Sequence, residues 1–68
     1  MTIYRFRFHL TNDLVGSDHI FDTFDSALLF YHNFRKRHGE DFHRAFLTKM
    51  TLRESTGEFV PVSELKFV

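Results

Sequence analysis

Hydrophobic and polar positions alternate strictly over residues 2–10, TIYRFRFHL. One face of this segment carries Tyr4, Phe6, Phe8 and Leu10, and the other carries Ile3, Arg5, Arg7 and His9. A period of two with aromatic and β-branched residues predicts a strand with one buried side. Residues 11–18, TNDLVGSD, have the composition of a loop. Residues 19–23, HIFDT, then predict a short second strand, antiparallel to the first.

Apolar positions next recur at helical spacing. Thr23 or Asp22 can cap the start of this helix, because their side-chain oxygens accept hydrogen bonds from first-turn amides. Four basic residues, 35–38, occupy the last turn before Gly39, which can take the left-handed conformation that ends a helix. The basic run is therefore typical of a helix C-terminus, and a recognition role is the alternative. The face expected to pack on the sheet consists of Phe24, Ala27, Leu28, Tyr31 and Phe34.

Two more strands are predicted after the helix. Residues 43–53 alternate less cleanly, with Phe46, Thr48, Met50 and Leu52 on one face and Ala45, Leu47, Lys49, Thr51 and Arg53 on the other. Residues 54–58, ESTGE, predict a hairpin turn in which Gly57 supplies a positive φ. The fourth strand, 58–62, belongs at an edge, because Pro61 cannot donate a hydrogen bond to a ladder. Residues 63–68 predict either a last strand or one helical turn.

This order of elements predicts one α+β domain over residues 1–68, a small antiparallel β-sheet of ββαββ order with one α-helix packed on one face. A single chain has nothing to cover the other face of that sheet. Beneath the helix we expect a core of Tyr4, Phe6, Phe8, Phe21, Phe46, Met50 and Phe59.

Composition narrows the class of protein. A chain of 68 residues buries only about 60% of its unfolded surface, and this one has no cysteine for a disulfide, so its ten phenylalanines and two tyrosines must supply the core. Nine basic and nine acidic residues give a net charge of zero, which speaks against a generic polyanion binder. The sequence lacks a signal peptide and any apolar run of about 20 residues. We therefore expect a cytoplasmic protein without a membrane partner and, because it begins at Met1, a complete small gene product.

Residues 19–34, HIFDTFDSALLFYHNF, and the hairpin at 49–62, KMTLRESTGEFVPV, resemble the layout of many short proteins encoded by tailed phages and prophages. In those proteins a helix with an early S-A-L step precedes a hairpin whose turn reads T-G-E. The five histidines and the arginine-rich first strand depart from that layout. The resemblance implies an adaptor or inhibitor that binds a host protein in the host cytoplasm, and it assigns no site residues.

The residue types that catalysis requires do not form a useful pattern. No serine lies in a nucleophile-elbow context, and the three scattered glycines form neither a P-loop nor a dinucleotide fingerprint. We therefore expect no enzymatic activity, no cofactor and no metal. A loop site formed by His38, Asp41 and His43 is the one metal-binding alternative, although no helical histidine pair supports it.

Two surfaces are candidates for binding. If the first and third strands are neighbours, the uncovered sheet face is basic, with Arg5, Arg7, His9, Lys49 and Arg53. Arginine there can make bidentate contacts with carboxylates or phosphates, and an ordinary solvated face is the alternative. The second surface is the helix flank, where Leu29, Phe30 and Leu47 exceed the needs of a small core and would form an interface if they were contiguous.

These surfaces predict a small protein-binding module, which in a phage setting would be an adaptor or inhibitor of a host protein. A nucleic-acid-binding module using the basic sheet face is less favoured, because sheets that bind single strands present aromatic rings outward and here the rings are expected to point inward. A structural homo-oligomer is a third class. A homodimer that buries the bare sheet or its edge is also compatible with protein binding.

Overall fold

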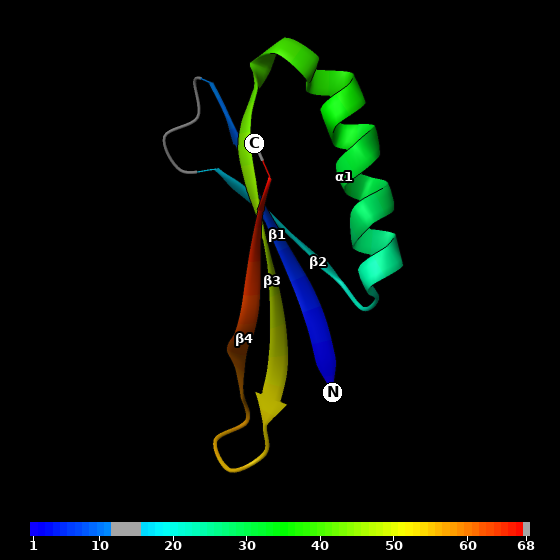
Figure 1. Cartoon of the computed structure of the whole chain (residues 1–68). Coiled ribbons are helices and arrows are strands. Elements are labelled where there is room, and N and C mark those ends of the chain that lie inside the picture. Colours follow the sequence, from blue (N-terminus) through cyan, green and yellow to red (C-terminus); the bar gives the residue numbers. More distant parts are fainter. Residues whose placement is uncertain (12–15, 68) are drawn as a thin grey trace.

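A computed structural model describes residues 1–11 and 16–67, which form a four-stranded antiparallel sheet with a helix on one face (Figure 1). The strands are β1 (Thr2–Leu10), β2 (Ser17–Phe21), β3 (Phe42–Arg53) and β4 (Glu58–Phe67). The helix α1 spans Phe24–His38, and a 3-10 turn, η1 (Gly39–Asp41), connects it to β3. The predicted α+β class and ββαββ order are confirmed. Positions 12–15 of the predicted loop and position 68 of the predicted tail lie outside the described residues.

The strands are ordered β2-β1-β3-β4, so the first and third strands are neighbours. In their register Arg5 lies opposite Thr48, and Phe6 lies opposite Leu47. β4 is an edge strand that contains Pro61, as predicted, and it continues through the tail to Phe67. A register shift beside Pro61 leaves Val62 without a partner on β3, so β4 is bulged at this point.

The start of α1 agrees with the prediction from the sequence, and its end does not. The Thr23 hydroxyl accepts a hydrogen bond from the amide of Ser26 at 3.1 Å, which confirms the predicted cap. Gly39 has φ −6°, so the expected left-handed ending is wrong, and the chain instead tightens into η1. Gly57 has φ +71° in the β3–β4 turn, as predicted.

Two phenylalanines of β1 are at the centre of the core. Phe6 and Phe8 are fully buried, and their ring centroids lie 4.9 Å apart. The ring of Phe8 stacks on Phe34 at 4.1 Å, and the ring of Phe6 stacks on Tyr31 at 5.6 Å. Such aromatic contacts contribute beyond the apolar area that they bury. The helix can approach closely because Ala27, which faces these rings, is small and fully buried.

The sequence assigned the wrong side of β3 to the core. Ala45 and Leu47 are buried under the helix, whereas Phe46 and Met50 lie on the opposite face, together with Phe59 of β4. The large rings of β1 and α1 fill the space over the sheet, so the shorter side chains of β3 fit beside them. The sheet therefore has a covered face, comprising Tyr4, Phe6, Phe8, Ala45, Leu47, Lys49, Thr51, Arg53, Ser63, Leu65 and Phe67. The open face comprises Ile3, Arg5, Arg7, His9, Asp18, Ile20, Arg44, Phe46, Thr48, Met50, Leu52, Phe59, Pro61, Glu64 and Lys66.

The buried stripe of the helix is also rotated relative to the predicted one. Phe30 packs against Phe8 at 5.7 Å, Phe21 at 5.1 Å and His19 at 4.6 Å, so it belongs to the core. Phe24, which was expected to be buried, is 38% exposed. The rotation follows from the position of β2 beside β1, because β2 gives the flank of α1 that carries Phe30 a surface to pack on.

The sheet is longer than the helix that covers it. The principal extents of the described residues are 43, 25 and 15 Å, and the hairpin end of β3 and β4 extends beyond α1 (Figure 1). In that part no described helix or strand forms a second layer on either face of the sheet.

Within the described residues, no helix has the length and apolar character needed to cross a membrane.

The packing predicts that stability depends much more on Phe8 than on Phe24. We expect Phe8→Ala to lower the free energy of unfolding by about 3–5 kcal/mol, because it opens a cavity in the core. Phe24→Ala removes the same atoms from a position that is 38% exposed and should cost clearly less. Urea unfolding of both variants measures the difference, and equal losses would contradict this arrangement of the core.

Candidate binding face of the sheet

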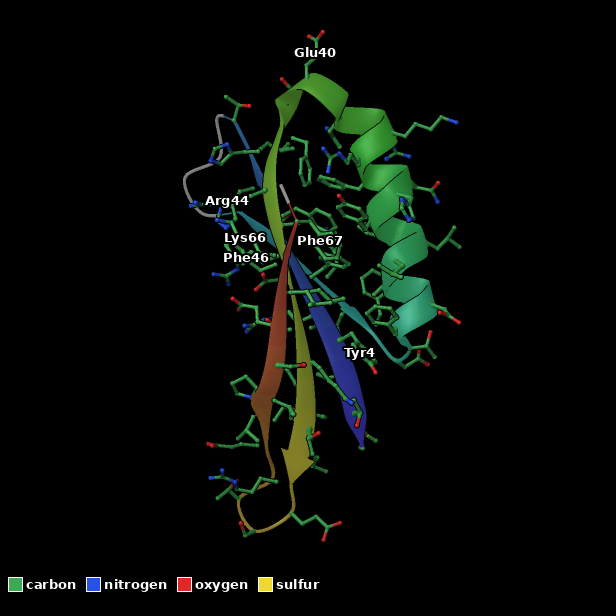
Figure 2. All side chains as sticks on the ribbon, viewed as in Figure 1. Tyr4, Glu40, Arg44, Phe46, Lys66 and Phe67 are labelled. Atoms are coloured by element: carbon green, nitrogen blue, oxygen red, sulfur yellow. The ribbon has the colours of Figure 1, made fainter. Side chains whose placement is uncertain are left out.

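The open face projects away from α1, and its side chains come from all four strands. Figure 2 shows Arg44, Phe46 and Lys66 on the side of the sheet away from the helix, whereas Tyr4 and Phe67 lie on the helix side. In the register of the sheet Arg44 lies opposite His9 and Phe46 lies opposite Arg7, and Lys66 of β4 lies opposite Phe46 from the other side. The open face is divided along its length into a cationic half and an apolar half.

The cationic half consists of Arg5, Arg7, His9, Arg44, Phe46, Thr48, Glu64 and Lys66. It contains a shallow hollow of about 230 Å³, lined by Arg5, Arg7, His9, Phe46, Thr48 and Glu64. Thr48 is buried even though it is on the open face, because its short side chain is surrounded by longer neighbours. The hollow therefore has a hydroxyl at its floor and charged groups at its rim.

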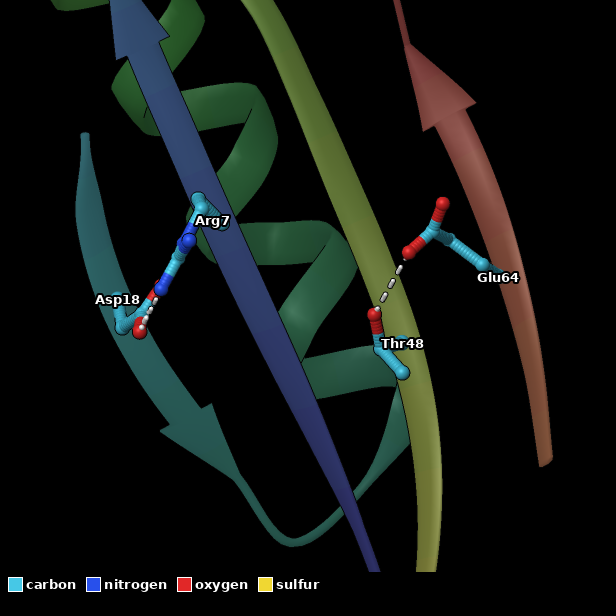
Figure 3. A network of polar contacts seen from close by, with 4 residues as sticks. All are labelled: Arg7, Asp18, Thr48 and Glu64. Atoms are coloured by element: carbon cyan, nitrogen blue, oxygen red, sulfur yellow. Dashed lines mark hydrogen bonds and ion pairs between the residues drawn. The ribbon is translucent and has the colours of Figure 1, made fainter. Parts of the chain in front are cut away.

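Arg7 is already engaged with a carboxylate. Its guanidinium donates two hydrogen bonds to Asp18 of β2, at 2.7 and 2.9 Å (Figure 3). The hydrogen bonds from Arg7 hold the pKa of Asp18 below its ordinary value, and the same interaction raises the pKa of Arg7. Both side chains are partly exposed, so solvent screens the pair and it contributes little to stability. Its main effect is to tie Arg7 to the β2 edge of the hollow.

Arg5 and Arg44 keep their donors available. In the part of the chain that the structure describes, no hydrogen bond or ion pair joins either guanidinium to another side chain. The guanidinium of Arg44 lies 5.7 Å from the centre of the Phe46 ring, and the ring of His9 meets Phe46 edge-on at 6.1 Å. One arginine with open hydrogen-bonding positions, Arg44, thus lies against an outward aromatic ring, and a second, Arg5, lines the same hollow.

The second carboxylate of this region is on β4. The hydroxyl of Thr48 donates a long hydrogen bond, 3.4 Å, to Glu64 (Figure 3). Asp18 and Glu64 therefore flank the cationic half on its two sides, on β2 and β4. The region contains these two carboxylates and four cations, Arg5, Arg7, Arg44 and Lys66. Its net charge is therefore positive, although the net charge of the whole chain is zero.

The apolar half lies toward the β3–β4 turn and consists of Ile3, Met50, Leu52, Phe59 and Pro61. Ile3 and Pro61 lie directly opposite Met50 from either side, and Phe59 lies opposite Leu52. Direct cross-strand neighbours touch through their side chains, so these five residues form a continuous patch. A continuous apolar patch on a sheet surface with no layer over it is typical of an interaction site.

Three of the side chains predicted to form the basic face do lie together, and two do not. Arg5, Arg7 and His9 share the open face. Lys49 lies opposite Tyr4 on the covered face, with Arg53 on the same side of β3, so the prediction that they stand beside Arg5 is wrong. The cause is the reversed reading of β3, because the residues next to Arg5 and Arg7 are Thr48 and Phe46.

The predicted helix-flank surface is not assembled. Leu29 is 64% exposed on the back of the helix, but Leu47 is only 3% exposed and Phe30 packs within the core. Arg44 and Lys66 also belong to the cationic half, although the sequence pattern did not predict them there. Arg44 projects to the same face of β3 as Thr48, because the two residues are four positions apart in a strand. Apolar residues on both faces of β3 made it impossible to tell from the sequence which face is the open one.

The metal-binding alternative is not supported by geometry. Among residues 1–11 and 16–67, no three histidine, cysteine or acidic side chains gather closely enough to hold a metal ion, and this includes His38, Asp41 and His43.

No protein-family model, curated protein or solved structure matches the chain.

The Arg7–Asp18 pair predicts a small pH-dependent contribution to stability. Because the folded pKa of Asp18 lies below the ordinary value of 3.8, the pair stabilises the fold above that pH and loses this effect as the pH falls through the folded value. Asp18→Asn should therefore lower the free energy of unfolding at about pH 7 and make little difference at about pH 2. Urea unfolding at both pH values measures this. The same difference between the two proteins at both pH values would show that the ion pair is not its source.

Proposed function

We propose that the protein is a non-enzymatic binding module whose open face docks a partner protein that carries apolar and acidic side chains side by side. The observation that carries this proposal is the division of one uncovered face into an apolar half and a cationic half. A partner that contacts both halves gains burial of apolar area from one and charge-assisted hydrogen bonds from the other.

The apolar half would supply most of the affinity. Met50 is at its centre, with Ile3 and Pro61 on either side, and the flexible thioether of methionine adapts to irregular partner surfaces. Phe59 adds an aromatic ring at the end of the patch nearest the turn. Apolar and aromatic anchors of this kind dominate binding energy when a partner excludes water from them.

The cationic half would supply orientation and specificity. Arg5 and Arg44 present donors that no acid of the described chain occupies, and a guanidinium binds a carboxylate through two parallel hydrogen bonds. Charges at the rim of an interface speed association and reject partners of the wrong sign more than they add affinity. An acidic partner surface is therefore favoured over a neutral one.

Single-stranded nucleic acid is the second candidate, and Phe46 is the observation that favours it. Its ring points outward between Arg44 and His9, contrary to the inward rings expected from the sequence, and outward rings on sheets stack on bases. Two features weigh against this candidate. Apart from Phe59, the side chains of the apolar half are aliphatic and offer no flat surface for stacking, and the carboxylates of Asp18 and Glu64 would repel phosphates.

The biological setting in this proposal comes from the resemblance to short phage and prophage proteins. In that setting the partner would be a host protein in the host cytoplasm, and docking would recruit or inhibit it. The resemblance contributes no residues, so the proposed contacts depend only on the open face.

The proposal is tested by affinity capture from bacterial lysate with the protein as bait, with and without nuclease. One variant, Arg5→Ser with Arg44→Ser, removes two charges from the open face. A matched control, Lys49→Ser with Arg53→Ser, removes two charges from the covered face. We expect a discrete protein to be retained by the original chain and by the control, and the open-face variant to bind it about tenfold more weakly or worse.

Two results would contradict the proposal. A captured protein that binds all three baits equally would place the contact elsewhere on the molecule. Material that is lost after nuclease treatment, with an affinity that falls steeply as salt rises, would transfer the assignment to nucleic acid, because phosphate contacts release counterions.

A further inference from the structure

The outer edge of β4 is complementary to itself, and we propose that two copies of the chain pair there. In this pairing the two β4 strands run antiparallel about a two-fold axis at Leu65, over residues 63–67. Glu64 of each copy then lies opposite Lys66 of the other, because these residues are equidistant from Leu65 along the strand. Opposite charges directly across an antiparallel pair stabilise it.

The fold leaves this edge available. β4 is one of the two edge strands, and it has ten residues against five in β2, the other edge. The helix lies mainly against β1 and β2, and in the described sheet β4 is hydrogen-bonded to β3 on one side only. An edge strand presents backbone donors and acceptors that another strand can pair with. Pro61 and the bulge at Val62 limit the pairing to the residues that follow them.

Charge selects the register. A two-fold axis perpendicular to the sheet must pass beside one residue of β4, which then faces its own counterpart. An axis at Glu64 would oppose two carboxylates, and an axis at Lys66 would oppose two ammonium groups. An axis at Leu65 opposes two apolar side chains and places two Glu–Lys pairs beside them. Of these three registers, only the one at Leu65 avoids like charges.

Side chains at the edge are suited to this register. Leu65 is 51% exposed on the covered face, at the margin of a second hollow of about 200 Å³ that includes Tyr4, Phe24 and Lys49. Its counterpart would cover it. Among residues 1–11 and 16–67, Glu64 is held only by the 3.4 Å hydrogen bond from Thr48, so its carboxylate can turn toward a lysine on the far side of the edge.

Pairing in this register would extend the proposed function without depending on it. A two-fold axis perpendicular to the sheet puts both helices on one side and both open faces on the other, so two four-stranded sheets become one of eight strands. The cationic halves of the two copies would meet at the seam through Lys66. The dimer would therefore offer two copies of the binding face in one surface.

Charge-swap variants test the register. In a dimer of Glu64→Lys, both cross-strand pairs become lysine opposite lysine. In a dimer of Lys66→Glu, both become glutamate opposite glutamate. We expect each variant to dimerise about tenfold more weakly than the original chain, since both cross-strand pairs become repulsive. An equimolar mixture of the two variants restores opposite charges at both positions and should form a heterodimer. Sedimentation equilibrium up to about 1 mM chain measures all four samples.

Circular dichroism of each variant would show that the monomer remains folded. Glu54→Lys, in the turn outside the paired segment, is the charge-matched control and should dimerise like the original chain. Three results would overturn the proposal: an original chain that stays monomeric at the highest concentration, single variants that dimerise as tightly as it does, or a mixture of folded variants that stays monomeric. These results are independent of partner capture, so failure of this inference leaves the proposed function standing.

Discussion

The stacking of Phe6 and Phe8 against the helix is the interaction on which the rest of the structure depends. These rings are the largest fully buried side chains, and they come from the strand that β2 and β3 flank. Tyr31 and Phe34 bind α1 to them, and Phe67 brings the end of β4 into the same cluster, with its ring 5.5 Å from Phe6. Because one helix of 15 residues covers only these rings and their neighbours, the described chain provides no second layer over the opposite face or the hairpin end.

Local patterns in the sequence predicted the elements well, and failed where the choice depended on contacts distant in the chain. The strict alternation of β1 identified both of its faces, since polar residues occupy one of them. β3 has apolar residues on both faces, so Phe46 and Leu47 were equally plausible core residues until the register with β1 placed Leu47 opposite Phe6. The prediction for Phe30 failed for the same reason. The sequence predicted β2, on which Phe30 packs, but not the position of β2 beside β1 in the sheet. The candidate site inherited these errors: Arg5, Arg7 and His9 were placed correctly, whereas Arg44 and Lys66 were missed.

The corrected register changes what the open face can do. Had Lys49 and Arg53 joined Arg5, the face would have been uniformly basic and suited to a polyanion. Instead Thr48 and Phe46 lie beside Arg5 and Arg7, and Met50 and Leu52 form an apolar region farther along β3. Asp18 binds Arg7, and the positive charge is confined to one half of the face. A surface with adjoining apolar and cationic regions selects its partner by the apolar side chains that the partner carries as well as by the partner's charge. This is a property of protein interfaces more than of nucleic-acid grooves.

The most direct test of the open face as the binding surface is photo-crosslinking from single positions. A benzophenone amino acid at Phe46 replaces one aromatic side chain by another within the cationic half of the open face, and the same residue at Leu29 reports from the exposed back of the helix. Irradiation in bacterial lysate should link a discrete protein to position 46 and not to position 29. Crosslinking from position 29 alone would show that the helix, and not the open face of the sheet, is the surface that binds.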